Sequence, residues 1–139
     1  MKSKSNVDVG LLLLRVVTGI LFLPHGIAKT LSGFKGVKAM LANNGMTELL
    51  WIGAFVGEVI APICLILGLF SRISGLLIAC VMIFAIILTE GSTAFTTTST
   101  TGAFVGELNF LYLILGVTFF ILGAGKYSLG IKSNNFLLQ

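Results

Sequence analysis

Four apolar stretches, each close to the length of a membrane span, are the feature that most constrains this chain. They cover about residues 10–28, 49–70, 73–89 and 103–122. A helix needs about 20 apolar residues to cross the hydrocarbon core of a bilayer. Only 10% of the residues are charged, against roughly 25% in soluble domains. The sequence therefore predicts an all-α fold, a four-helix transmembrane bundle that forms one domain over residues 1–139.

The connections between these stretches are short, which leaves no room for a soluble catalytic domain. The segment "TLSGFKGVKAMLANNGM" places Phe34, Val37 and Leu41 at helical spacing, which predicts a short interfacial helix after the first span. The hydroxyl-rich segment 91–102 predicts a solvated outer loop. The alternative for this segment is a lid that folds over the outer mouth of the bundle.

Lysine and arginine residues near the ends of the spans predict the orientation. One side of the membrane carries Lys2, Lys4, Arg72, Lys126 and Lys132, and the other carries Lys29, Lys35 and Lys38. Because basic residues favour the cytoplasmic side, both termini are expected in the cytoplasm. The basic residues are scattered singly, so we expect the lipid bilayer, and no nucleic acid, as a partner.

Ionisable and small residues share one face of the first span. Arg15, Thr18, Gly19, Phe22, His25, Gly26 and Lys29 follow one another at steps of three or four residues. This spacing stacks them along one side of a helix. Charged side chains inside a membrane turn toward other helices and pair there. We therefore expect Arg15 to pair with Glu58 of the second span, and Lys29 to pair with Glu107 at a shallower depth.

The pentapeptide "AFVGE" occurs at residues 54–58 and again at residues 103–107. Each copy begins a predicted helix that runs inward, which suggests two helix hairpins related as a parallel repeat. Pro62 follows Glu58 by four residues, and its missing N–H frees the carbonyl group of Glu58. The first copy thus places a carboxylate beside loosened backbone.

Polar residues near the outer ends of the helices predict a cavity that opens outward. The candidate site residues are Arg15, His25, Lys29, Glu58, Glu107 and Asn109. Such a cavity would bind a polar headgroup or handle protons, and the alternative is that the charges are ion pairs that fix helix register. The Glu and His residues lack the i, i+3 or i, i+4 spacing of ligand pairs, so no metal is expected.

The two cysteines, Cys64 and Cys80, both lie inside apolar stretches. We interpret them as small buried side chains. A redox pair is the alternative, because the two residues lie at similar depths on either side of the turn at Ser71.

Three segments carry a family pattern: "LLRVVTGILFLPHGIAK", then Glu58 followed by "LILGLFSR", and finally "LGAGKYSLG". Together they resemble the DoxX family of small four-helix membrane proteins, over about residues 10–130. The positions that carry over are Arg15, Gly19, Gly26, Lys29, Glu58, Gly68, Arg72, Gly125 and Ser128. The chain departs from the family pattern at Pro62, and at Gly130, where members often have Asp.

The resemblance implies an integral protein of a prokaryotic cytoplasmic membrane and leaves three functions open. The first is a quinone- or lipid-binding subunit of a redox, sulfur or oxidative-stress system, in which polar residues bind the headgroup and Phe22, Phe55 and Phe110 contact its ring. No motif for a cofactor held in the chain is present, so quinone and a membrane or peripheral redox protein are the expected partners. The second is a non-catalytic scaffold for a partner protein. The third is a small-solute transporter, which with so few spans would work as an oligomer such as a homodimer.

Overall fold

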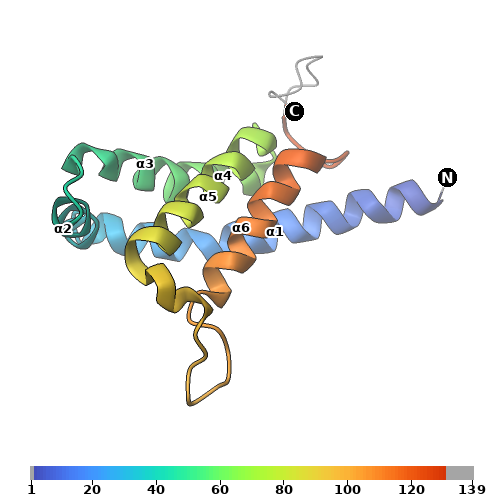
Figure 1. Ribbon diagram of the computed structural model, residues 1–139. Helices are drawn as coiled ribbons and strands as arrows, with labels where there is room; N and C mark the ends of the chain where they lie inside the picture. Colours follow the sequence, from blue (N-terminus) through green and yellow to red (C-terminus); the bar gives the residue numbers. More distant parts are fainter. Residues whose placement is uncertain (1, 131–139) are drawn as a thin grey trace.

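The computed structural model describes residues 2–130, with side chains from residue 6 onward. The helices are α1 Lys2–Leu31, α2 Lys35–Asn43, α3 Trp51–Phe55, α4 Ala61–Leu67, α5 Ser71–Ala85 and α6 Glu107–Leu122 (Figure 1). The π-helical turn Val56–Ile60 joins α3 to α4, and the π-helical turn Ile86–Glu90 extends α5. Two 3-10 turns cover Glu48–Leu50, before α3, and Gly91–Phe95, after the second π turn. Residues 2–130 contain no strand, and only an isolated bridge joins Thr97 and Phe104. The all-α fold is confirmed.

Three helical runs are long and apolar enough to cross a membrane. They cover Asn6–Leu31, Glu48–Leu67 and Ser71–Phe95. The fourth predicted span corresponds to α6, which is apolar but has 16 residues. Its length is about 24 Å at 1.5 Å per residue, against a hydrocarbon core about 30 Å thick.

Small residues set how closely the helices pack. α5 crosses α6 where a Cβ on Gly75 would overlap the carbonyl oxygen of Gly116, and a Cβ on Gly116 would overlap that of Gly75. α1 approaches α4 at Gly19, where a Cβ would overlap Pro62 and Ile66. Membrane helices pack through such close approaches, because lipid provides no hydrophobic drive for their association.

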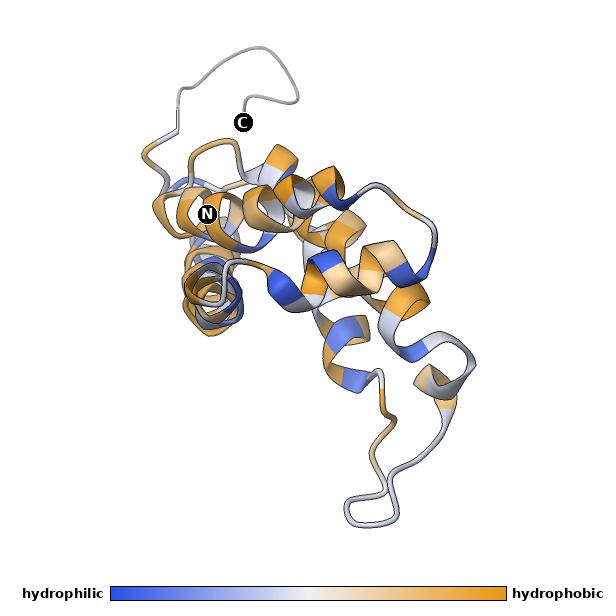
Figure 2. Cartoon of the chain, turned by 90° about the vertical axis from the view of Figure 1, so that its left-hand side faces the viewer, coloured by the Kyte–Doolittle hydropathy of each residue, from blue (hydrophilic) through white to orange (hydrophobic). Residues whose placement is uncertain are grey.

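The buried core lies between α1, α4, α5 and α6. Its side chains are Phe22, Ala61, Leu65, Ile78, Met82, Tyr112 and Phe119. Figure 2 shows hydrophobic residues along most of the helices, and large apolar side chains such as Leu13, Leu21 and Ile114 are exposed. That distribution suits helices whose outer surfaces meet lipid.

Hydrogen bonds bring the first part of α1, the turn between α4 and α5, and the segment after α6 to one end of the molecule. The N–H of Lys126 donates to Asp8 Oδ1 over 3.1 Å, and the N–H of Leu129 donates to the carbonyl oxygen of Leu67 over 3.2 Å. Asp8 of α1, the Gly68 turn and the segment up to Leu129 therefore lie close together. Lys132, which entered the charge count, lies outside the described residues.

The short helix predicted after the first span is present as α2, and Phe34, which precedes it, and Leu41 are buried as the spacing predicts. Lys38 Nζ lies 5.0 Å from the ring centre of Trp51, and the rings of Phe34 and Trp51 are 5.2 Å apart. These contacts fasten α2 to the start of the second helical run.

The segment between the 3-10 turn Gly91–Phe95 and α6 is a small hairpin that projects away from the helices (Figure 1). Its backbone is joined by bonds from the N–H of Thr98 to the oxygen of Ala103, and from the N–H of Val105 to the oxygen of Thr96. The two "AFVGE" copies differ in position. The second precedes α6 as predicted, whereas residues 54–58 lie inside a helical run that already begins at Glu48, so the expectation that both copies begin helices was wrong.

Candidate functional site

Glu58 is the centre of the candidate site, and its backbone explains its position. The residue lies in the π-helical turn Val56–Ile60, four residues before Pro62. Since proline has no N–H, the carbonyl group of Glu58 cannot receive the usual α-helical bond, and π turns often occur at functional sites. A Cβ on Gly26 would overlap this carbonyl group. Gly26 therefore allows α1 to lie directly against the loosened turn.

The Glu58 carboxylate is paired with Lys29. Lys29 Nζ lies 2.6 Å from Glu58 Oε1. The Glu58 side chain is 2% exposed and that of Lys29 is 40% exposed. Glu58 Oε2 is buried and has no hydrogen-bond partner within the described chain. One carboxylate oxygen is thus engaged, and the other is available to a ligand.

This pairing corrects the expected ion pairs. Arg15 is 2% exposed, but its guanidinium donates to the carbonyl oxygens of Ala124, over 2.9 Å, and Tyr127, over 2.6 Å. Gly68 makes room for it, because a Cβ there would overlap the guanidinium. The expected pair of Arg15 with Glu58 was wrong because the irregular segment after α6 offers carbonyl groups at the level of Arg15.

Arg72 holds the same end of the molecule. Its guanidinium donates to the carbonyl oxygens of Phe120, over 2.7 Å, and Ile121, over 2.5 Å, in the last turn of α6. The last carbonyl groups of a helix lack partners within the helix, so an arginine there satisfies and neutralises them. Both arginines therefore anchor this end of the molecule, Arg72 at the last turn of α6 and Arg15 at the segment beyond it.

The two candidate residues of α6 lie apart from each other. Glu107 is exposed at the first position of α6, where the helix N-terminus favours a carboxylate, and the expected pair with Lys29 was wrong because Glu58 engages that lysine. Asn109 Nδ2 donates to Glu90 Oε1 over 2.7 Å. Glu90 Oε2 is buried without a hydrogen-bond partner among residues 2–130.

A polar cavity of about 160 Å³ lies on one side of the ion pair. Its wall includes His25, Lys29, Glu58, Asn109 and Tyr112. Four of the six predicted site residues therefore line one cavity, whereas Arg15 and Glu107 do not.

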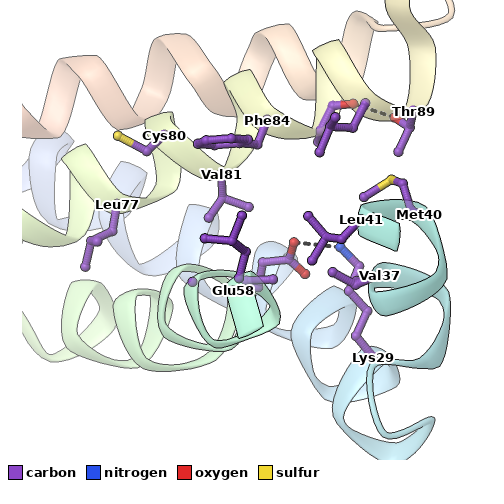
Figure 3. Close-up of a pocket in the computed structure, with 15 residues that line it drawn as sticks. Lys29, Val37, Met40, Leu41, Glu58, Leu77, Cys80, Val81, Phe84 and Thr89 are labelled. Carbon is purple, nitrogen blue, oxygen red and sulfur yellow. Dashed lines mark hydrogen bonds and ion pairs between the residues drawn. The ribbon is translucent and has the colours of Figure 1, made fainter. Parts of the chain in front are cut away.

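An apolar cavity of about 220 Å³ lies on the other side, between α2, α3 and α5 (Figure 3). The two cavities share Lys29, Glu58, Ala85 and Thr89 in their walls. The ion pair is therefore placed where the polar and apolar cavities meet.

Tyr112 is a site residue that the sequence analysis missed. Its ring centre lies 4.7 Å from that of Phe22 and 6.4 Å from that of His25. The signal was the spacing of Asn109, Tyr112 and Gly116 at steps of three and four residues, which places them on one face of α6. That face packs inward.

Both cysteines are free thiols. Cys64 is half-buried in α4, and Cys80 is exposed in the wall of the apolar cavity. The interpretation of Cys80 as a buried side chain was therefore wrong. Within residues 2–130, no group of three or more His, Cys, Asp or Glu side chains lies close enough to hold a metal ion.

Comparison with known proteins assigns the family. The DoxX family profile matches residues 10–91. A curated protein of Bacillus subtilis (strain 168), named "Putative oxidoreductase CatD", is 33% identical over 110 residues, which cover 79% of this chain and 75% of that protein. No solved structure matches the chain significantly. The family match covers more than half of the chain, and the chain is therefore a member of the DoxX family of membrane proteins.

Proposed function

We propose that this protein is the quinone-binding membrane component of an oxidoreductase system, with its site in the polar cavity beside Glu58. The observation that carries the proposal is Glu58 Oε2, a buried carboxylate oxygen without a hydrogen-bond partner in the described chain. Leaving such a group unsatisfied costs about 1–3 kcal/mol. The O–H of a reduced quinone, the quinol form, can donate to this oxygen and would recover that free energy.

The residues around the cavity suit a quinone headgroup. A quinone ring is flat and apolar with a carbonyl oxygen at each end, so it needs aromatic contacts and hydrogen-bond donors. Phe22 and Tyr112 supply the aromatic surface, and Lys29, His25 and Asn109 supply donors. Small-molecule sites generally combine apolar walls with a few placed polar groups.

A bound quinone would supply a two-electron, two-proton redox couple. The chain's own contribution is to hold the protons. The Lys29 ammonium group, which pairs with Glu58, and the imidazole of His25 line the polar cavity. His25 is exposed at the surface of α1. Electrons would come from a partner protein of the flavin or iron–sulfur class, and the name of the Bacillus relative fits an oxidoreductase role.

The proposal includes an arrangement in the membrane. We place the three long helical runs and the shorter α6 across a prokaryotic cytoplasmic membrane, with both termini in the cytoplasm. The polar cavity then opens toward the outer side, since Lys29 lies near the end of α1 that is remote from the N-terminus. The bias of Lys and Arg toward the terminal side supports this orientation.

The test is anaerobic equilibrium binding of a chain-free, fully ring-substituted hydroquinone to the protein in lipid nanodiscs, comparing the wild type with Glu58→Gln. Its O–H donates to a charged carboxylate in the wild type and to a neutral amide oxygen in the variant, and hydrogen bonds to charged groups are about twice as strong as neutral ones, so we expect the Kd to rise about ten-fold. Glu48→Gln is the matched control, because Glu48 begins the same helical run and is exposed. Wild-type affinity in Glu58→Gln would contradict the proposal. Absence of quinone binding, together with retention of a stoichiometric partner protein, would favour a scaffold.

A further inference from the structure

The apolar cavity is a groove along one side of the third helical run. Leu77, Val81, Phe84 and Leu88 line it at steps of three or four residues, with Cys80 beside Val81, so one continuous helix face forms its floor. Figure 3 shows Leu77, Val81 and Phe84 along this helix. The eleven residue steps from Leu77 to Leu88 give it a length of about 16 Å at 1.5 Å per residue. The groove therefore lies along the helix axis and has an elongated shape.

The groove is polar only where it meets the site beside Glu58. The opposite wall comes from apolar side chains of α2, including Val37 and Leu41. Lys29, Glu58 and Thr89 are the residues that this groove shares with the polar cavity, together with Ala85. A ligand that fills both cavities must be polar at one end and hydrocarbon along the rest of its length.

The groove is also accessible from the lipid. Gly53 lines it and is exposed, and a Cβ built on Gly53 meets no atom within 4 Å. Phe84, on the facing helix, is also exposed. The mouth between α3 and α5 thus opens on the side where the bilayer would lie. A cavity with walls this apolar is a poor site for water and a good site for hydrocarbon.

We propose that this groove holds the prenyl chain of a membrane quinone whose headgroup lies in the polar cavity, and that the chain enters sideways from the lipid between α3 and α5. This inference rests on the proposed function and adds the class of quinone, a lipid-soluble one with a chain. The chain gains van der Waals contacts in the groove and loses little solvation, because lipid is as apolar as the groove. The chain should therefore change the Kd of the quinone little. A better test of the proposal is whether the chain blocks access to a residue in the groove.

Cys80 provides the positional readout, because it lies in the wall of the groove, whereas Cys64 does not line either cavity. In a Cys64→Ser protein in nanodiscs, a lipid-soluble maleimide labels Cys80 alone. Adding a fully ring-substituted benzoquinone with a decyl chain, at about ten times its Kd, should slow labelling about ten-fold, since about one site in ten stays free. The same ring without a chain, at equal occupancy, should leave the labelling rate unchanged.

A substitution that fills the mouth of the groove, with a matched control elsewhere, tests the same proposal. Gly53→Leu places a side chain in the mouth of the groove, and Gly10→Leu is the control, because a Cβ at Gly10 also meets no atom within 4 Å and the residue lines neither cavity. We expect Gly53→Leu to abolish protection of Cys80 by the decyl quinone while the chain-free quinone still binds, and Gly10→Leu to behave as wild type.

The possible outcomes separate this inference from the proposed function. If both quinones bind but Cys80 labelling never slows, the inference is overturned and the headgroup site stands. If neither quinone binds, both are overturned. If phospholipid nanodiscs protect Cys80 before any quinone is added, with the rate unchanged afterwards, the groove holds an acyl chain of lipid and the inference is overturned.

Discussion

Removing one member of the Lys29–Glu58 pair should have very different consequences for the two residues. Glu58 is 2% exposed, whereas Lys29 is 40% exposed. In Lys29→Met, the carboxylate loses its partner and cannot reach water, and breaking a buried pair in this way costs about 3–5 kcal/mol. We therefore expect the free energy of unfolding to fall by about 3 kcal/mol.

Replacing Glu58 instead leaves the charge of Lys29, which is not confined to the protein interior. In Glu58→Gln, the flexible Lys29 side chain can turn its ammonium group toward water, so we expect a loss of about 1 kcal/mol. If the two effects were independent, the double variant Lys29→Met/Glu58→Gln would lose about 4 kcal/mol. Because the double variant contains no buried charge at this position, we expect it to lose only about 2 kcal/mol, a coupling of about 2 kcal/mol.

Unfolding in mixed micelles with increasing SDS provides the measurement. Trp51 is the only tryptophan of the chain, and its ring packs against Phe34, so its fluorescence reports on the folded state. Lys35→Met, at an exposed position of α2, is the control and should change stability by less than about 0.5 kcal/mol. A loss in Glu58→Gln as large as in Lys29→Met, or strictly additive losses in the double variant, would refute this reasoning.

Three further variants test other parts of the molecule. Arg15→Ala removes two charge-assisted hydrogen bonds to the segment after α6, so the free energy of unfolding should fall by about 3 kcal/mol. Limited trypsin digestion should then cut faster at Lys126, and an unchanged rate would contradict the anchoring role of Arg15. Gly26→Ala should lower the Tm, because the added methyl group overlaps the π turn, whereas Gly10→Ala should be neutral or stabilising by up to about 1 kcal/mol. Asn109→Leu should weaken quinone binding and should also lower stability, because Glu90 Oε1 loses its hydrogen bond; full affinity would remove this amide from the site.

The helices and the interfacial helix could be predicted from the sequence because their signals are local. The length of an apolar run predicts a span, and the period of Phe34, Val37 and Leu41 predicts a helix. Neither property depends on how the rest of the chain folds. The face of α1 that carries Gly26 and Lys29 was also predictable from its period, and it does pack against the second helical run.

The pairing of charges could not be predicted in the same way. A shared helix face does not determine how two helices cross, so the sequence cannot distinguish Arg15 from Lys29 as the partner of Glu58. The acceptors of Arg15 are backbone carbonyl groups in an irregular segment, and no pattern of side chains encodes where such groups point. The matching letters of the two "AFVGE" copies likewise carried no information about depth.

The π-helical turn Val56–Ile60 accommodates one extra residue at the site without shifting the rest of the second helical run. A π turn contains one residue more than the α-helical path that it replaces. Deleting Val56 would allow a regular α-helix to continue into α4, so the chain would keep its helical content. Because the α turn closes over nearly the same rotation with one residue fewer, the side chains on both sides of the deletion would keep their directions. Trp51 and Gly53 would keep their present neighbours, and the deletion would change mainly the position of Glu58 within the turn.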